Sequence, residues 1–152
     1  MNLTFREARE HDVDTIVKML SDDILGSKRE RYEHPLPNSY MQAFKAIDKD
    51  PNNELIVACL EGEVIGVLQI TFTPYLTHQG SWRATIEGVR TSSRVRGLGA
   101  GTEMMEWAIQ RAKDRDCHLI QLTTDKQRPE ALRFYEKIGF EATHEGMKLK
   151  LI

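Results

Sequence analysis

The chain has 152 residues, of which 40% are hydrophobic and 29% charged, and its net charge is −2. This length suits one domain with a substantial core, so we expect a single domain over residues 1–152. The charge argues against nucleic-acid binding, which calls for a strong basic excess, and no apolar run reaches the roughly 18 residues of a membrane span.

The N-terminus enters a strand-like segment without the pattern of a signal peptide, which favours the cytoplasm. The two cysteines, Cys59 and Cys117, lie far apart, and we expect buried thiols rather than a disulfide or a nucleophile. No cluster of histidine, cysteine and aspartate has the spacing of metal ligands, so no metal is expected.

The first elements in chain order are a strand and a helix. Residues 3–8 alternate apolar and polar side chains, as in a strand with one buried face. Asp12 and Asp14 suit the N-terminus of a helix whose inward stripe reaches Ile24. Gly26 is the expected stop of this helix.

A charged, proline-bearing loop is predicted over residues 27–38, before a shorter helix that ends at residues 50–53. Residues 55–72 indicate two strands joined by a hairpin turn. A second loop over residues 75–81 leads into the strand predicted over residues 82–89.

The second half of the chain predicts two helices and three short strands. An apolar stripe indicates a helix over residues 102–112, and residues 119–123 form the next strand. Residues 129–139 read as a helix opened by proline and closed by glycine. Final strands are expected over residues 140–142 and 146–151, which makes six or seven strands and about four helices in a mixed α/β order.

A glycine-rich turn joins the strand before it to the helix after it. Residues 94–101 have the sequence RVRGLGAG, with glycine at three alternate positions and two arginines. Such a turn lets a phosphate approach the backbone N–H groups, and the helix N-terminus adds partial positive charge. The turn therefore predicts an anion site, with a tight turn that merely needs glycine as the alternative.

Two common phosphate-binding motifs do not fit this turn. The dinucleotide fingerprint G-x-G-x-x-G would place its last glycine at Thr102, or at Met104 in the other possible frame. The P-loop fails as well, because no Gly-Lys-Ser/Thr follows.

The turn instead resembles the acetyl-CoA-binding motif of the GNAT superfamily of N-acetyltransferases, Arg/Gln-x-x-Gly-x-Gly/Ala. The motif fits from Arg96 and equally from Arg94, and we prefer Arg96 because the helix then begins at residues 101–102. The sequence RPEALRFYEKIGF over residues 128–140 resembles the C-terminal motif of that family, Asn-x-x-Ala-x-x-x-Tyr-x-x-x-Gly-Phe. The resemblance implies a single GNAT domain with a central twisted mixed sheet of six to seven strands and about four flanking helices.

The resemblance also implies acetyl-CoA as cosubstrate. Its pyrophosphate would lie on the N–H groups of the glycine turn, and its pantetheine arm would pair with the preceding strand. The residues implied in binding it are Val89, Arg90, Thr91, Arg96, Gly97, Leu98, Gly99, Ala100, Gly101 and Thr102. Arg128 stands where relatives carry asparagine near the cofactor and is a further candidate contact.

Two residues are candidates for catalysis. Tyr135 is neutral at pH 7 and has a proton to give to the leaving sulfur, which makes it the candidate general acid; a core aromatic is the alternative. Glu87 is the candidate base, acting through water or by orienting the amine. Its alternative role is an ion pair with Arg83 or Arg90.

The acceptor site is expected between the loops of residues 26–40 and 73–81. The candidate substrate-binding residues there are Tyr32, Glu33, His34, Tyr75 and His78. A carboxylate at Glu87 favours a cationic primary amine, and we expect a small molecule rather than a peptide. A protein or peptide acetyltransferase, a CoA-binding regulatory module without turnover, and a homodimer all remain open.

Overall fold

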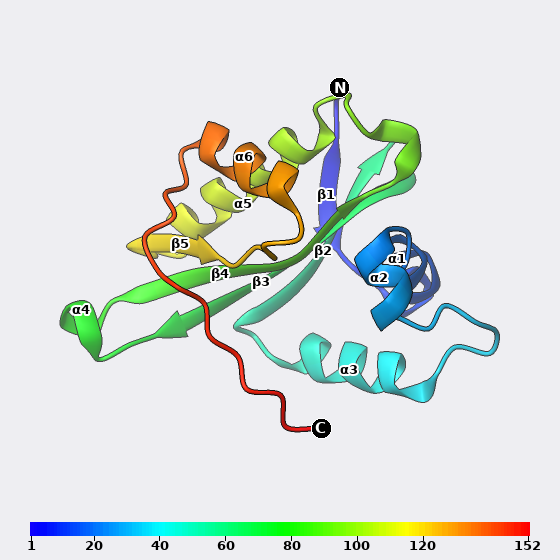
Figure 1. The fold of residues 1–152 in the computed structure, drawn as a ribbon, viewed down its shortest axis with the longest axis horizontal. Helices are drawn as coiled ribbons and strands as arrows, with labels where there is room; N and C mark the ends of the chain where they lie inside the picture. Colours follow the sequence, from blue (N-terminus) through cyan, green and yellow to red (C-terminus); the bar gives the residue numbers. More distant parts are fainter. The chain divides into compact units, whose positions relative to one another are not determined.

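The computed structural model describes residues 1–152 in two compact units, Met1–Gln121 and Leu122–Ile152 (Figure 1). The first unit contains almost all of the sheet and five helices, and the second contains one helix and the C-terminal segment. The fold is mixed α/β, as expected, whereas a single domain over the whole chain stays a prediction.

A five-stranded sheet, in the order β1-β2-β3-β4-β5, organises the first unit. Its strands are β1 (Thr4–Glu7), β2 (Asn53–Leu60), β3 (Glu63–Pro74), β4 (Trp82–Thr91) and β5 (Leu119–Leu122). From β1 to β4 each strand pairs antiparallel with the next. The hairpin between β2 and β3 turns at Glu61 and Gly62, both with positive φ, which suits the twist of its strands.

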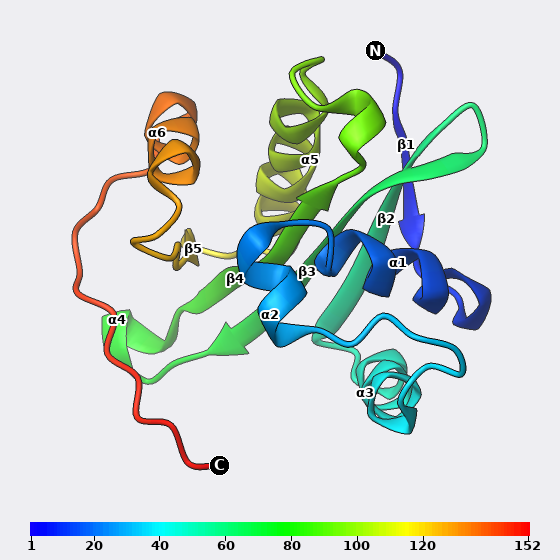
Figure 2. The ribbon, with the colours of Figure 1, turned by 45° about the vertical axis from the view of Figure 1, so that its right-hand side comes forward.

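Helices cover both faces of this sheet (Figure 2). They are α1 (Val13–Leu20), α2 (Ile24–Arg29), α3 (Asn38–Lys49), the short α4 (Thr77–Gly80) and α5 (Ala100–Asp114), with 3-10 turns at Glu10–Asp12 and Ser93–Val95. Val57 and Cys59 of β2 pack in one core cluster with α1 and Phe44 of α3. The opposite face lies under α5, where Met104 comes so close to Gly66 that a Cβ there would be 2.6 Å from its sulfur. No helix combines the length and apolar character that crossing a bilayer requires.

The prediction of one helix that stops at Gly26 is wrong in one respect, because this stretch forms two helices, α1 and α2. Asp23 caps α2 by accepting a hydrogen bond from the N–H of Gly26 at 2.6 Å, and Ile24 is 76% exposed rather than part of the core. Gly26 is buried inside α2, where a Cβ would collide with the carbonyl oxygen of Leu20. Gly26 thus allows the two helices to approach closely and does not stop a helix.

Most other expected elements are confirmed, with shifted ends. The helices α3 and α5 and the strand β5 form where the sequence predicted them, and the loop before α3 shrinks because α2 continues to Arg29. In the second unit, α6 (Pro129–Ile138) begins with proline and ends at Gly139, whose φ is 116°. The N–H of Phe140 closes this end on the carbonyl of Tyr135 at 3.1 Å.

The two strands predicted after α6 are wrong. Residues 140–152 form no strand, so the sheet has five strands instead of six or seven, and the helices number six rather than about four. The alternating pattern of residues 146–151 is real, but a strand needs a neighbour to take its backbone hydrogen bonds, and the chain pairs nothing with this segment.

A buried ion pair ties α5 to β2. Glu54 is 8% exposed and accepts hydrogen bonds from Arg111 at 2.9 and 2.5 Å, and this pairing raises the pKa of Arg111. We expect Arg111→Met to lower the free energy of unfolding by about 2–3 kcal/mol, because the buried carboxylate loses both hydrogen bonds from Arg111 and keeps only the ion pair with Arg115, whose nitrogen lies 3.7 Å away. Urea unfolding measures the change. Lys113→Met on the exposed side of the same helix is the control, and equal effects of the two substitutions would contradict this role.

A second buried carboxylate links β1 to the start of α1. Arg6 donates two hydrogen bonds to Asp12, at 2.7 and 3.0 Å, and the N–H of Arg9 donates a third. These donors, Arg6 foremost, lower the pKa of Asp12 below its ordinary value. The stability that this pKa shift provides is complete above the unfolded pKa of ~3.9 and is lost as the pH falls through the folded pKa.

Acid unfolding of Asp12→Asn should therefore be less steep than that of the unchanged chain. We expect the substitution to cost about 1–2 kcal/mol at pH 7 and progressively less as the pH falls through the folded pKa of Asp12. Thermal unfolding between pH 7 and pH ~2 follows the difference. Asp48→Asn, at an exposed position of α3, should leave the slope unchanged. Parallel curves for Asp12→Asn and the unchanged chain would contradict the assignment.

Candidate functional site

A β-bulge interrupts β4 beside the predicted base. Glu87 pairs with Gln69 and Arg90 with Val67, so two residues of β4 face the single residue between those partners on β3. Gly88, one of the two, has φ of 61°, a conformation that glycine adopts without strain. The bulge bends the strand and takes backbone groups out of the regular ladder at this point.

Val89 is the other residue of the bulge. Its carbonyl oxygen accepts a hydrogen bond from the Arg90 side chain at 2.8 Å. The bulge takes Val89 out of the regular register, so its N–H is a candidate donor to a ligand. A fixed backbone donor is the group that polarises a carbonyl in acyl transfer.

The glycine turn follows directly and ends at the first residue of α5. Gly97 and Gly99 have φ of 79° and 88°, and a Cβ on either would meet no atom within 4 Å, so the outer side of the turn is open. The helical ladder begins with the N–H of Glu103, which donates to Gly99 at 3.2 Å. The N–H groups of residues 100–102 precede that ladder and have no helical acceptor. This arrangement fits an anion at the N-terminus of a 15-residue helix.

Fewer backbone N–H groups of the glycine turn are available to an anion than the sequence predicted. The N–H of Leu98 donates to the carbonyl of Val95 at 3.2 Å, so it holds the turn together rather than facing outward. The side chain of Leu98 is 60% exposed. The predicted contact of Leu98 with the cosubstrate can therefore involve its side chain but not its N–H, and it stays a prediction.

The two arginines of the turn have different neighbours. Arg94 pairs with Glu63, at the β2–β3 hairpin, with 2.8 Å between nitrogen and oxygen. Arg96 reaches Asp22, donating to its carbonyl oxygen at 3.2 Å and lying 3.5 Å from its carboxylate. Arg96 thus joins the glycine turn to the turn between α1 and α2, and the motif register that begins at Arg96 stays a prediction.

Sequence reasoning missed the residues that the α1–α2 turn brings to this place. Asp22 contacts Arg96, and the methyl Cδ2 of Leu20 would lie 3.9 Å from a Cβ on Gly88. The end of α1 thus flanks the bulge and the glycine turn together. The acidic pair Asp22-Asp23, within the predicted first helix, was the only signal, and it gives no spatial information.

Glu87 is exposed at the start of the bulge. Its carboxylate is therefore not buried, and the side chain is accessible to a ligand from solution. The alternative ion pair with Arg83 does not form, because the Arg83 guanidinium lies over the ring of Tyr75, 4.4 Å from its centroid.

The predicted acceptor residues form two separate groups. Tyr32 donates to Asp14 at 2.9 Å, which raises the pKa of its hydroxyl, and the ring of His34 meets Tyr32 edge-on at 5.3 Å. Glu33 points instead to Arg31, 2.6 Å away.

The second group lies at the far end of the β3–β4 hairpin. There Tyr75 is covered by Arg83, and the ring of His78 lies 5.3 Å from that of His118. Figures 1 and 2 both place α4 and the loop between α2 and α3 at opposite ends of the first unit. The two loops therefore do not enclose one compact site.

The second unit carries the other two candidates. Tyr135 lies in the middle of α6, half-buried, with the rings of Phe134 and Phe140 edge-on at 5.2 and 5.9 Å. Arg128 is the residue before α6, and its N–H donates to the carbonyl of Asp125 at 2.9 Å. The catalytic role of Tyr135 and the cofactor contact of Arg128 stay predictions.

The cysteines are free thiols, as expected. Cys59 is buried and Cys117 is half-buried, and burial raises the pKa of the Cys117 thiol. A raised pKa keeps the thiol protonated and unreactive at neutral pH.

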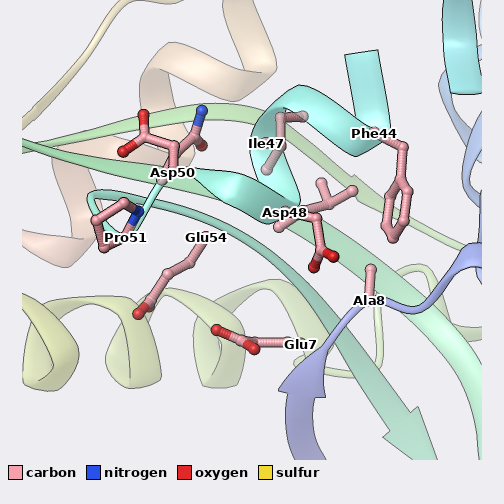
Figure 3. Close-up of a pocket in the computed structure, with 10 residues that line it drawn as sticks. Glu7, Ala8, Phe44, Ile47, Asp48, Asp50, Pro51 and Glu54 are labelled. Carbon is pink, nitrogen blue, oxygen red and sulfur yellow. The ribbon is translucent and has the colours of Figure 1, made fainter. Parts of the chain in front are cut away.

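A small pocket lies elsewhere, between the ends of β1 and β2 and the helix α3 (Figure 3). Its volume is about 100 Å³, well below the size of ordinary ligand sites. Carboxylates line it: Glu7, Asp48, Asp50 and Glu54. Negative charge and small volume make this pocket unsuitable for a phosphate-bearing ligand.

Comparison with known proteins identifies a family whose model covers most of the chain. The family model described as "Acetyltransferase (GNAT) family" matches residues 20–140. An aminoalkylphosphonate N-acetyltransferase of Salmonella typhimurium is 28% identical over 106 residues, covering 70% of this chain and 68% of that protein. The L-amino acid N-acetyltransferase AaaT of Escherichia coli is 28% identical over 120 residues, covering 77% and 70%. A crystal structure titled as a transcriptional regulator from Bacillus halodurans is 67% identical, with a TM-score of 0.95, covering 99% of this chain and all of that one.

Proposed function

The chain belongs to the GNAT acetyltransferase family, and we propose that it acetylates the primary amine of a small molecule, with Glu87 as general base and Tyr135 as general acid. As a member of this family it is an acetyl-CoA-dependent N-acetyltransferase. The observation that carries the proposal is the bulge of β4, which leads within a few residues into an open glycine turn at the start of α5. One short stretch thus offers a carboxylate, a candidate donor for a carbonyl and an anion site.

The cosubstrate supplies an activated acetyl group, and the chain has groups suited to hold it. The first-turn N–H groups of α5 and the cation of Arg96 suit a pyrophosphate. The N–H of Val89 suits the thioester carbonyl, where a donor stabilises the charge that develops on oxygen.

The proposed transfer requires two proton acceptors and one donor. The ammonium of the acceptor loses a proton to Glu87, and the free amine forms a bond to the acetyl carbon while the carbon–sulfur bond breaks. Tyr135 gives the sulfur a proton, and the new amide loses the second amine proton. In total the ammonium loses two protons, the thiol takes one and solvent receives one.

The exposed carboxylate of Glu87 favours an ammonium group on the acceptor, and the named relatives favour a small acceptor. Glu87 is exposed beside the bulge, so its carboxylate is accessible to attract an ammonium. The Salmonella and Escherichia coli relatives are named for aminoalkylphosphonates and L-amino acids, which are small amines. A panel of small amines and lysine peptides tests the preference, and higher kcat/KM for a peptide than for every small amine would contradict it.

Glu87→Gln should lower kcat/KM for the amine by about tenfold or more, because the variant can neither accept the proton nor attract the ammonium. In this variant the rate should rise less steeply with pH, and KM for acetyl-CoA should be unchanged. Steady-state kinetics from pH 6 to pH ~9 measure these effects. Glu106→Gln, at an exposed position of α5, is the control. Unchanged kinetics in Glu87→Gln would rule out both the basic and the orienting role.

A CoA-binding regulatory module without turnover is the second candidate, and the 67% identity to a protein titled as a transcriptional regulator favours it. The two candidates differ in one respect, since only the enzyme consumes acetyl-CoA when an amine is present. Tight binding of CoA together with no turnover on any amine would support the regulatory module.

A further inference from the structure

Two buried polar atoms at the end of the β3–β4 hairpin have no hydrogen-bond partner within the chain. They are Oγ of Ser81 and Nε of Arg83, two residues apart at the start of β4. The hairpin extends beyond α1 and α3 and ends at α4 (Figures 1 and 2). A buried polar group without a partner is uncommon, because burial removes its hydrogen bonds to water. Two such groups at one place indicate a position where a ligand supplies the missing acceptor.

Arg83 also forms no ion pair at this end of the hairpin. Its guanidinium lies over the ring of Tyr75, 4.4 Å from the centroid, and this ring carries no net charge. No aspartate or glutamate occurs in residues 64–86, so the hairpin end has no carboxylate of its own. A guanidinium presents its N–H donors in a plane that matches the oxygens of a carboxylate or a phosphate. An anionic group therefore fits both the charge of Arg83 and its free Nε–H donor.

Arg83 lies on the same face of β4 as the proposed base. Side chains alternate along a strand, so Arg83, Thr85 and Glu87 share one face, whereas Ile86 is buried on the other. Thr85 stands directly opposite Thr71 of β3. This face thus presents a carboxylate, two hydroxyl-bearing side chains and a cation in a row. At ~3.3 Å per residue, the Cα atoms of Glu87 and Arg83 are about 13 Å apart.

We propose that the end of the hairpin is an anion site, in which Arg83 and Ser81 bind a carboxylate or phosphate group at the far end of the acceptor. The inference rests on the proposed function for the other end of the acceptor, where Glu87 takes the ammonium. The acceptor is then an elongated amine with its cationic and anionic groups at opposite ends. The hydroxyls of Thr71 and Thr85 lie between those ends and suit polar groups along its length.

Anion binding tests this site without any turnover. Inorganic phosphate is added to the ¹⁵N-labelled protein, and NMR follows the Nε–H signal of Arg83, which is assigned through its loss in Arg83→Lys. We expect this signal to shift and to saturate with phosphate. The Nε–H of Arg111, which donates to Glu54 at 2.9 Å, is the control and should not move. An Arg83 signal that stays in place as phosphate is added would overturn the proposal.

A length series connects the anion site to the acceptor. Straight-chain ω-amino acids of increasing length are compared with alkylamines of equal length, which lack the carboxylate. Once the chain reaches from Glu87 to Arg83, kcat/KM for the ω-amino acid should exceed that for the alkylamine by about tenfold or more. Arg83→Gln should remove this advantage and Arg83→Lys should keep part of it. Arg9→Gln, which removes an exposed cation elsewhere on the first unit, should keep all of it.

The two experiments separate this proposal from the proposed reaction. Equal kcat/KM for ω-amino acids and alkylamines at every length would overturn the proposed role in acceptor binding. Saturable phosphate binding at Arg83 together with no turnover on any amine would support the anion site and contradict the proposed reaction.

Ser81→Ala distinguishes ligand binding from a structural role. Because Oγ of Ser81 has no partner within the chain, its removal should leave the midpoint of thermal unfolding unchanged or raise it. The same variant should lower kcat/KM for the long ω-amino acids by about threefold or more and leave kcat/KM for the alkylamines unchanged. A lower midpoint with unchanged kcat/KM would assign Ser81 to structure and overturn its place in the site.

Discussion

Tyr135→Phe is expected to lower kcat by about 10²-fold or more while the affinity for CoA changes little. The substitution removes one hydroxyl and keeps the ring, so the edge-on contacts with Phe134 and Phe140 persist and α6 keeps its packing. Without the hydroxyl, the leaving sulfur must take its proton from water. Single-turnover kinetics, which isolate the chemical step, measure the effect.

The control is Tyr40→Phe, which removes a hydroxyl that donates to Glu30 at 2.9 Å and takes no part in the proposed chemistry. Its kcat should equal that of the unchanged enzyme. If the rate of the chemical step in Tyr135→Phe equalled that of the unchanged enzyme, Tyr135 would have a packing role only. This is the core aromatic that the sequence offered as its alternative role.

Gly99→Asp should raise Kd for CoA by about 100-fold or more, because a carboxylate would replace open space beside the helix N-terminus where an anion is expected to bind. Gly99 has φ of 88°, so any side chain also strains the backbone, by about 1 kcal/mol. Isothermal titration calorimetry gives Kd, and thermal unfolding reports the strain.

Two further variants separate charge from strain. Gly99→Asn has the same shape without the charge and should lose less affinity than Gly99→Asp. Gly62→Asp places a carboxylate at another glycine of positive φ, 81°, in the β2–β3 hairpin, and should cost stability without affecting CoA. Equal CoA affinity in Gly99→Asp and the unchanged chain would remove the glycine turn from the site.

Local signals predicted the elements that the structure confirms. The proline and glycine around α6, the alternation on either side of the β2–β3 hairpin and the glycine turn before α5 all depend on residues near one another in sequence. Such preferences act within a few residues, so a single sequence reveals them.

The errors have a different cause, because they depend on spatial neighbours. The close approach of α1 and α2 explains Gly26, and the sequence alone could not distinguish this role from a helix stop. The strand pattern of residues 146–151 is correct as a pattern, but a pattern does not reveal whether the same chain supplies a partner.

The candidate site shows the same division. The Gly-Val pair at residues 88–89 lies inside a strand pattern, where glycine can indicate a bulge, yet only the pairing register showed that bulge. The contact between Arg96 and Asp22 joins residues 74 positions apart, and the two loops expected to enclose the acceptor lie at opposite ends of the first unit. In each example the residue types indicated a possible role. The sequence did not show which of these residues lie close together in space.

The most direct test is the release of free CoA thiol from acetyl-CoA, followed with a thiol reagent while amines are added one at a time. The protein should release thiol at a rate that rises and saturates with the concentration of at least one small primary amine, and the amine should gain an acetyl group by mass spectrometry. Glu87→Gln and Tyr135→Phe should each reduce that rate. If no amine raised thiol release above the rate in buffer, while calorimetry still showed CoA binding, the proposed acetyl transfer would be contradicted and the regulatory module would take its place.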